Sequence, residues 1–346
     1  MRLITSLLLF VLISSCKQDV QKPSKTYKSV EIQDIYNDSL SIRAIELMGD
    51  GTLAFAANKG TYGLYFPKKE QWATSKQLYD SIPLHFRAVA HTSNDFFMLS
   101  IENPALLYKT GDDGSMKLVY KEEGEGVFYD AMTFWNDTDG IAVGDKIGNC
   151  LSVIITRDGG ETWTKLACDV LPKAVEGEGA FAASNTNIKV LGDNAWIVTT
   201  SGTIYYTEDK GDSWISIDTP MINTVANQGI FSIDFYDDQH GFAVGGDYTK
   251  PTVNINNKMR TADGGKTWEL VADGELPGHK SCVQYMPNSD AKTLVAVSNS
   301  GIDLSNNSGD LWTHISDVPF YTIRFLNDST AYAAGKGRIS KLIFKK

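Results

Sequence analysis

Long hydrophobic runs are nearly absent from this chain of 346 residues, because the only one lies at the extreme N-terminus. A polytopic membrane protein is therefore excluded. Basic clusters are absent too, since the seven Arg are scattered and the formal net charge is −10 with His neutral. An acidic chain of this kind is a poor partner for a phosphate backbone, so we expect no binding of nucleic acid.

Cysteine is scarce, with four in the chain. Cys150, Cys168 and Cys282 show no CxxC spacing, which argues against a zinc site and against a disulfide framework. The spacing leaves a pairing of Cys150 with Cys168 open, and Cys282 is most simply a buried small residue. The five His share no metal-ligand spacing, and neither a phosphate-binding Gly-rich loop nor a Ser nucleophile elbow occurs. We therefore predict no metal and no cofactor.

The N-terminus predicts export to a bacterial cell envelope. Residues 1–15 contain one early Arg, a short apolar stretch and small residues, the order of a signal peptide whose apolar run is too short to cross a bilayer. The ending Ile13-Ser-Ser-Cys16 resembles a lipobox, in which Cys16 is lipidated; a plain signal peptide with a chance Cys is the alternative. Residues 16–26 would then be a lipidated Cys and a polar tether on the periplasmic or outer-membrane face. Residues 27–346 remain for one domain.

One motif recurs along that domain, and we call it the Asp motif. It has the pattern T-x-D-x-G-x-T/S-W at 156–163, 207–214 and 261–268, with worn copies at 305–312 and 110–116. We expect a β-hairpin at each copy, because Asp bonds to backbone N–H groups of its own turn and Gly takes a positive φ. The Trp then packs under a neighbouring strand. The residues with these structural roles are Asp158, Gly160, Trp163, Asp209, Gly211, Trp214, Asp263, Gly265 and Trp268.

The spacing of the motif predicts the fold. Trp163, Trp214, Trp268 and Trp312 are 51, 54 and 44 residues apart, the length of a four-stranded propeller blade. Innermost strands are expected to start near residues 42, 86, 131, 189, 232, 283 and 322. The last unit has three strands, so we expect 27–33 to supply its fourth and to close the ring. We predict an all-β, seven-bladed β-propeller of four-stranded antiparallel blades. A ring of six or eight blades is the alternative, because the sequence of the fourth blade is irregular.

Charged and aromatic residues gather where the innermost strands are expected to begin. Arg43, Arg87 and Asp130 occupy aligned positions in three successive units, so we expect them at one mouth of the central channel. Mixed charges that converge on a concave mouth favour a binding site, whereas a ring of salt bridges that holds the blades together is the alternative. The candidate binding residues are Arg43, Arg87, Tyr129, Asp130, Asp145, Glu178, Asp247, Tyr248 and Lys280.

The Asp motif resembles the Asp-box of BNR repeats. With the phrases GIFSIDF, FAVGGDYTKP and EGEGAFAAS, the resemblance covers nearly all of the chain after the tether. The chain is similar to BNR-like propellers related to the photosystem II stability/assembly factor, whose bacterial members often carry the labels oxidoreductase or glycosyl hydrolase. The resemblance implies a face that holds a membrane-protein precursor, with Arg43 and Arg87 as candidates for the partner's acidic or C-terminal group. Two Arg beside acidic residues depart from a fully basic face.

Binding and catalysis are both candidate functions. The favoured one is a membrane-tethered, monomeric assembly module whose channel mouth engages a membrane protein, a polypeptide segment or a small anionic or glycan ligand. The alternative is an enzyme, because sialidases share the Asp-box. A glycosidase needs two carboxyl groups that flank one bond, and the candidates are Asp130 with Glu178 or Asp145. An oxidoreductase, as the family label suggests, would need a cofactor fingerprint that the sequence lacks.

Overall fold

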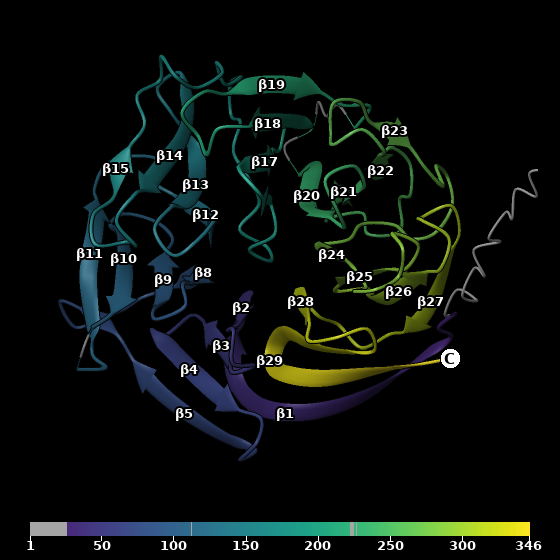
Figure 1. The fold of residues 1–346 in the computed structure, drawn as a ribbon, viewed down its shortest axis with the longest axis horizontal. Coiled ribbons are helices and arrows are strands. Elements are labelled where there is room, and N and C mark those ends of the chain that lie inside the picture. The colour runs from purple at the N-terminus through teal and green to yellow at the C-terminus, as the bar shows by residue number, and fades with distance from the viewer. Residues whose placement is uncertain (1–25, 112, 222–224, 226) are drawn as a thin grey trace, which may run out of the picture.

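The computed structural model describes residues 26–346 except 112, 222–224 and 226. These residues form seven antiparallel sheets around a central axis (Figure 1), which confirms the predicted seven-bladed propeller. The part of the chain that is described contains no helix, and hence none long and apolar enough to cross a membrane. The signal peptide predicted at 1–15, and Cys16 with the tether up to residue 25, lie outside the described residues.

In the first six blades, the strands follow one another from the axis outward. The first three blades contain β2 (Ala44–Leu47), β3 (Leu53–Ala56), β4 (Thr61–Phe66) and β5 (Gln71–Lys76); β8 (Phe86–His91), β9 (Phe96–Ser100), β10 (Ala105–Thr110) and β11 (Met116–Glu122); and β12 (Tyr129–Phe134), β13 (Gly140–Ile147), β14 (Cys150–Thr156) and β15 (Thr164–Lys165). The next three contain β16 (Ile188–Leu191), β17 (Asn194–Val198), β18 (Thr203–Thr207) and β19 (Ile215–Asp218); β20 (Gln228–Phe235), β21 (Gly241–Asp247), β22 (Lys258–Thr261) and β23 (Glu269–Leu270); and β24 (Cys282–Tyr285), β25 (Leu294–Ser298), β26 (Gly301–Ser305) and β27 (Trp312–Ser316). The seventh blade contains β28 (Thr322–Phe325), β29 (Thr330–Lys345) and β1 (Ser29–Ser41), and a small hairpin of β6 (Leu78–Tyr79) and β7 (Ile82–Pro83) joins the first two blades.

The N-terminal strand closes the ring, as predicted. β29 bends back on itself (Figure 1), and the backbone N–H of Phe344 donates to the carbonyl oxygen of Ser329 at 2.8 Å. Residues 331–334 of β29 pair with β28, whereas residues 336–345 pair with β1. The seventh blade therefore consists of β28, the two halves of β29 and β1, and its outermost strand, β1, comes from the start of the domain. This pairing leaves no open sheet edge between the two ends of the ring.

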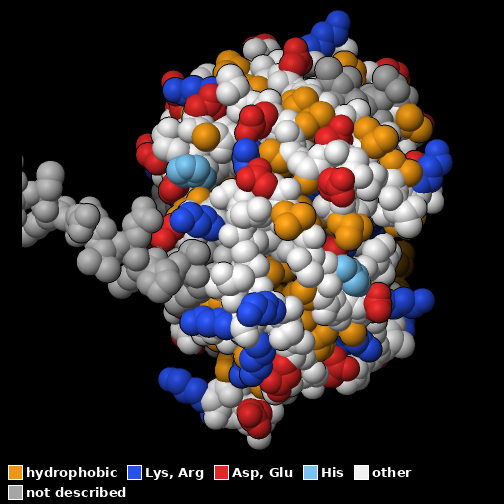
Figure 2. Space-filling view, turned by 90° about the vertical axis from the view of Figure 1, so that its right-hand side faces the viewer, with side chains coloured by type: hydrophobic (Ala, Val, Ile, Leu, Met, Phe, Trp, Pro, Cys, Tyr) orange, Lys and Arg blue, Asp and Glu red, His pale blue; other side chains and the backbone are white. Residues whose placement is uncertain are grey.

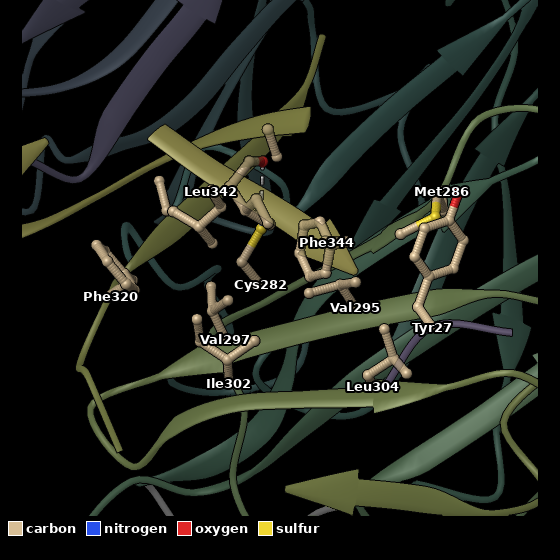
Figure 3. Packing of buried hydrophobic residues seen from close by; sticks show 13 residues of the cluster. Tyr27, Cys282, Met286, Val295, Val297, Ile302, Leu304, Phe320, Leu342 and Phe344 are labelled. Carbon is tan, nitrogen blue, oxygen red and sulfur yellow. Dashed lines mark hydrogen bonds between the residues drawn. The ribbon is translucent and has the colours of Figure 1, made fainter. Parts of the chain in front are cut away.

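The hydrophobic core lies between neighbouring blades. At the closing seam, Leu342 and Phe344 of β29 pack with Val295 and Val297 of β25 (Figure 3), and Tyr27 joins the same cluster with 3% of its surface exposed. Cys282 belongs to this cluster and is fully buried, as expected. Similar clusters join each pair of adjacent blades, so burial of apolar side chains fixes one blade against the next.

The three full copies of the Asp motif make the same hydrogen bonds. Asp158 accepts from the backbone N–H of Thr162 at 3.0 Å and from its hydroxyl at 2.6 Å. Asp209 and Asp263 accept in the same way from the residues four positions later. Each turn lies between the third and fourth strands of its blade. The carboxylates are therefore engaged by their own turns.

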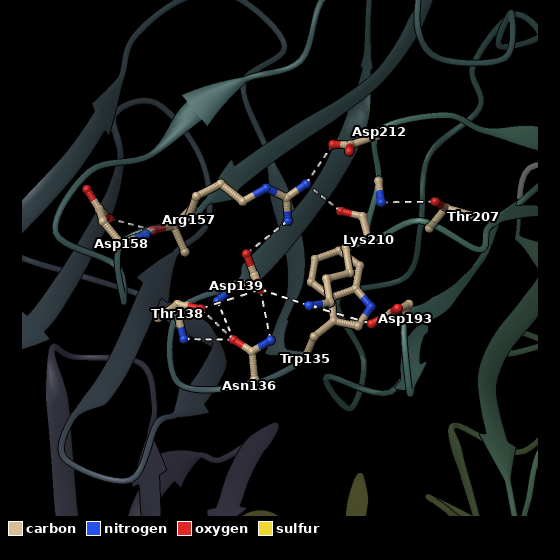
Figure 4. A network of polar contacts seen from close by, with 12 residues as sticks. Trp135, Asn136, Thr138, Asp139, Arg157, Asp158, Asp193, Thr207, Lys210 and Asp212 are labelled. Atoms are coloured by element: carbon tan, nitrogen blue, oxygen red, sulfur yellow. Dashed lines mark hydrogen bonds and ion pairs between the residues drawn. The ribbon is translucent and has the colours of Figure 1, made fainter.

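The outer side of the molecule carries charges of both signs. Between the third and fourth blades, Arg157 contacts Asp139 at 3.4 Å and Asp212 at 3.0 Å (Figure 4). The side shown in Figure 2 carries both acidic and basic side chains, with hydrophobic side chains scattered among them. Such exposed ion pairs contribute little to stability, and they leave the field of the outer surface mixed.

A disulfide joins Cys150, the first residue of β14, to Cys168 beyond β15. The sequence left this pairing open. The two residues are 18 positions apart, so the crosslink closes a short loop that includes the first full copy of the Asp motif. In the chain-entropy picture such a crosslink stabilises the fold by restricting the unfolded chain.

Replacement of both residues, Cys150→Ala with Cys168→Ala, should therefore lower the free energy of unfolding by about 3 kcal/mol. Urea denaturation followed by Trp fluorescence measures this difference. Dithiothreitol should shift the parent protein by a similar amount and leave the double variant unchanged. A double variant as stable as the parent would contradict the role given to the disulfide.

Candidate functional site

A pocket of about 270 Å³ lies at the mouth of the channel where the innermost strands begin. Arg43 lies directly before β2, and Arg87 is the second residue of β8, so two neighbouring blades each contribute one guanidinium group to it. Tyr248, which follows β21, lines the same pocket. The structure thus brings together three of the nine binding candidates from three different blades.

The two guanidinium groups are held by neutral partners. Arg43 lies 4.0 Å from the ring centroid of Tyr321, and its Nη1 donates to the carbonyl oxygen of Ala183 at 3.4 Å. Arg87 donates from Nη1 to the carbonyl oxygen of Ala182 at 3.3 Å. Among the described residues, no carboxylate oxygen lies within 4.0 Å of either group. The pocket therefore contains two cations without a direct counter-ion.

Burial lowers the pKa of Arg43 and Arg87, because a charged group loses hydration inside the protein. The positive charge of Arg87 lowers the pKa of Arg43 further, whereas the carboxyl group of Asp130 acts in the opposite direction on Arg87. Both groups stay protonated because an Arg side chain titrates far above neutral pH. An anion in the pocket would relieve the repulsion between them.

Aromatic rings form another wall of the pocket. Phe181 and Phe231 are stacked with their centroids 3.6 Å apart and their planes 6° apart. Tyr248 meets both rings edge-on, at 6.4 Å and 6.3 Å. Burial, and then the charge of Lys280, lowers the pKa of His279 to about 4, so its ring, edge-on to Phe231 at 4.5 Å, is neutral at pH 7. The wall is therefore uncharged.

The floor of the pocket is a stretch of irregular backbone that crosses the channel. We call residues 182–187 the plug segment; all six are buried, and the loop that drops from the fourth blade into the centre of the ring is visible in Figure 1. Asn185 donates to the carbonyl oxygen of Val89 at 2.8 Å and accepts from the N–H of Met132 at 2.9 Å. Ser184 donates to the carbonyl oxygen of Ser281 at 2.7 Å. The plug segment closes the channel beneath the arginines.

The opposite mouth of the channel has a different character. A larger hollow of about 590 Å³ is lined there by Glu46, Lys189, Asp234 and Arg324. Lys189 pairs with Asp234 at 2.7 Å, and Glu46 pairs with His91 at 3.0 Å. Arg324 donates to carbonyl oxygens of the plug segment. The sequence offered a salt-bridge ring as the alternative for the mouth with Arg43 and Arg87, whereas the structure places ion pairs between neighbouring blades at the opposite mouth.

None of the six remaining candidates lines the pocket, and four of them have partners elsewhere in the chain. Tyr129 is buried and donates to Glu122 at 2.7 Å, and Lys280 is buried and ion-paired with Asp303. Asp247 accepts from the backbone N–H of its turn residue Thr249 at 2.9 Å. These groups are engaged within the chain.

Glu178 is the fourth of them, and it is 4% exposed. It accepts from the hydroxyl of Ser201 at 2.6 Å, from the hydroxyl of Tyr205 at 3.2 Å and from the backbone N–H of Val175 at 2.9 Å. Its carboxylate therefore anchors the loop that leads into the plug segment.

Asp130 and Asp145 form an acidic pair behind the plug segment. Asp130 has no exposed surface, and burial, together with the charge of Asp145, raises its pKa well above the usual value. Burial also raises the pKa of Asp145 to about 6, although the backbone N–H of Ala180 donates to it at 3.1 Å. A glycosidase needs two carboxyl groups that reach its substrate. Asp130 and Glu178 are buried, so neither of the suggested pairs, Asp130 with Glu178 or Asp130 with Asp145, has two exposed carboxyl groups. The described residues also contain no cluster of three metal-ligating side chains.

Solved structures share this fold at low sequence identity. YCF48 bound to a D1 peptide aligns with a TM-score of 0.65 and 14% identity over 94% of this chain and 98% of that chain. YCF48 from Cyanidioschyzon merolae gives 0.59 and 12% over 92% and 98%. A catalytically inactive virginiamycin B lyase from Staphylococcus aureus with quinupristin gives 0.67 and 14% over 91% and 99%. At these identities the likeness shows the propeller fold.

Sequence comparisons cover less of the chain. The family model described as sortilin, neurotensin receptor 3, matches residues 151–275, about a third of the chain. No curated protein matches the sequence. The chain is therefore placed by its fold alone, as a propeller.

Sequence reasoning found the arginines and Tyr248 but missed Phe181 and Phe231, the two stacked rings of the aromatic wall. Arg43 and Arg87 align in the repeat, which placed them at the same mouth. Phe181 lies in an irregular segment that follows no strand pattern. Phe231 lies at the bulge of β20 between Ile230 and Ser232, the place that Arg87 has in β8 and Asp130 has in β12, so the alignment of the blades was the signal for it. For Phe181 the available signal was the phrase EGEGAFAAS between the third and fourth blades. A stretch of small residues without strand alternation is typical of backbone that packs closely against other backbone.

The acidic pair predicts a pH dependence. A carboxyl group whose pKa is raised in the folded state contributes most favourably below its unfolded value, near 3.8, and this contribution is lost as the pH rises through about 6. Asp145→Asn should therefore stabilise the protein by about 1–2 kcal/mol more at pH 7.5 than at pH 4.5. Thermal unfolding at the two pH values measures the difference, with exposed Asp169→Asn as the matched control. A variant effect that is equal at both pH values would refute this.

Proposed function

We propose that this protein is an assembly-factor-like binding propeller that holds a polypeptide segment in the pocket of Arg43 and Arg87. The observation that carries the proposal is the presence of two guanidinium groups, without a carboxylate partner in the described part of the chain, in one concave site. Guanidinium groups bind carboxylates with paired, charge-assisted hydrogen bonds. A propeller of the same fold, YCF48, has been solved with a D1 peptide bound, which supports a polypeptide ligand.

The shape of the pocket supports one kind of approach. Because the plug segment closes the channel under Arg43 and Arg87, an extended chain cannot pass through the ring at this point. An internal segment would have to enter the pocket and turn back. A chain end, or a single acidic side chain that projects from the partner, enters without such a turn. The carboxylate at a C-terminus or on an acidic residue is therefore the group we assign to the two arginines.

The partner itself should be captured in an Arg-dependent way. The double change Arg43→Gln with Arg87→Gln removes both positive charges, and each charge-assisted bond contributes roughly 1.5–3 kcal/mol. Affinity should fall at least about tenfold. Proteins captured from detergent-solubilised envelope membranes are identified by mass spectrometry with the parent and the variant. Arg338→Gln, on β29 and away from the pocket, is the matched control for loss of a positive charge.

Loss of the same captured proteins in the double variant alone, with unchanged melting temperature, is the expected result. Equal capture by the parent and the double variant would overturn the proposal. Equal loss with Arg338→Gln would show a general charge effect and would also count against the pocket.

We also propose that Cys16 carries a lipid that holds the propeller at a membrane surface in the bacterial cell envelope. The support is the sequence Ile13-Ser-Ser-Cys16 after a short apolar run. The structure contributes that the domain begins with β1 at Ser29, so a short polar stretch separates the lipid from the ring. A polypeptide ligand would then belong to the same membrane.

In detergent phase separation the mature protein should enter the detergent phase, because acyl chains add about 0.8 kcal/mol for each buried methylene group. Cys16→Ser should move it to the aqueous phase or leave the precursor unprocessed. The propeller variant Cys282→Ser is the control, since it changes a cysteine without touching the N-terminus. Entry of a processed Cys16→Ser protein into the detergent phase, as for the parent, would refute lipidation.

A further inference from the structure

We propose that Phe181, Phe231 and Tyr248 form a specificity subsite for an apolar side chain of the bound polypeptide, next to the carboxylate that the two arginines hold. This inference rests on the proposed function and deepens it, because it states what chemistry must accompany the anion. The arginines alone would accept any carboxylate, whereas an apolar wall in the same pocket selects among carboxylates.

The rings are pre-organised for this role. Phe231 is 4% exposed and fixed in place, with His279 edge-on to it at 4.5 Å. Phe181 is half-buried and stacked parallel on Phe231 at 3.6 Å, and Tyr248 is 51% exposed at the rim. Rings held by one another lose little conformational freedom when a ligand binds. An inorganic anion would leave this wall in contact with water, whereas an apolar side chain would cover it.

The plug segment and the residue before it tie the aromatic wall to the arginines. Phe181, Ala182 and Ala183 are consecutive in the chain. The carbonyl oxygens of Ala182 and Ala183 accept from Arg87 and Arg43, at 3.3 Å and 3.4 Å. One short backbone stretch therefore sets the distance between the apolar wall and both cations. A ligand must present its carboxylate and its apolar group on neighbouring atoms to satisfy both.

A second hollow favours a polypeptide over a carboxylated sugar. Tyr321 lines the pocket and also a hollow of about 610 Å³ that includes Ser41, Asn58 and Lys336, where β1 meets β29. Lys336 is exposed there. The site thus continues from the channel mouth toward the pairing of β1 with β29, which suits a polypeptide that extends beyond its terminal residue. A single sugar would occupy only the first hollow.

The hydroxyl partners that a sugar requires are also few. Ser281 lines the pocket, but its hydroxyl donates to the carbonyl oxygen of Tyr321 at 2.8 Å and is placed 3.1 Å from that of Val297. Aromatic rings and two guanidinium groups make up much of the remaining wall. This composition matches an apolar side chain beside a carboxylate better than a ring of hydroxyl groups.

Fluorescence anisotropy with labelled octapeptides tests the subsite. Three probes share a Gly-Ser body and end in Phe with a free carboxylate, in Gly with a free carboxylate, or in Phe with an amide. The parent protein should bind the Phe acid at least about tenfold more tightly than the Gly acid, because an aromatic side chain leaves water. Amidation should weaken binding by a similar factor.

The variants separate the two parts of the site. Phe181→Ala should bring the preference for Phe over Gly close to one and leave the affinity for the Gly acid within about twofold. Tyr248→Ala, at the exposed rim, should reduce the preference in the same direction without touching the plug segment. Arg43→Gln should weaken both acids alike. Tyr236→Ala, which lies at the opposite mouth of the channel, is the matched control and should change nothing.

Each contrary outcome has a defined meaning. Equal affinity of the parent for the Phe and Gly acids, with dependence on Arg43, would overturn the subsite and leave the proposed function in place. No binding of any peptide up to about 1 mM would overturn both. Binding of N-acetylneuraminic acid in place of the peptides would assign the pocket to a carboxylated sugar and would also overturn both.

Discussion

The hydrogen bonds that hold the plug segment across the ring are the constraint on which the rest of the site depends. Residues 182–187 are buried without being part of a sheet, so their polar groups need partners from elsewhere. The innermost strands and their leading loops supply many of them, because Val89, Met132, Ser281 and Thr322 all bond to this segment, whereas the side-chain amide of Asn187 is buried without a partner among the described residues. The contacts reach the second, third, sixth and seventh blades. The plug segment thereby divides the central channel of the propeller into two separate mouths, each closed at its inner end.

The division gives the two mouths different chemistry. On one side the carbonyl oxygens of Ala182 and Ala183 accept from Arg87 and Arg43, which gives the two cations neutral partners, and Nε of Arg43 stays buried without a hydrogen bond to any residue that the structure describes. On the other side Arg324 bonds to the same segment, and its neighbours Lys189 and Asp234 neutralise one another at 2.7 Å. Unneutralised charge in a partly desolvated site is costly unless a ligand supplies the opposite charge. The mouth with Arg43 and Arg87 is therefore the one suited to an anion.

The repeat made the fold predictable, and side-chain length limited the prediction of the site. The Trp spacing indicated the length of a blade, the seven innermost strand starts indicated the number of blades, and the three-stranded last unit indicated the closing strand. Arg87 and Asp130 occupy equivalent places at irregular ends of β8 and β12, yet the long Arg side chain reaches the pocket whereas the short Asp stays buried behind it. Glu178 and Phe181 belong to an irregular segment whose path is set by contacts with distant blades, which no local pattern encodes.

The central claim is that ligand binds only at the blind mouth formed by the plug segment. Hydrogen–deuterium exchange, followed by mass spectrometry with and without a saturating carboxylate-ended peptide, tests it most directly. The account predicts new protection in the peptides that contain Phe181–Ala183, Tyr248 and Tyr321. It predicts no change around Asp234 and Gln284, which lie at the other mouth. Protection around Asp234 and Gln284 without protection of Phe181–Ala183 would contradict it.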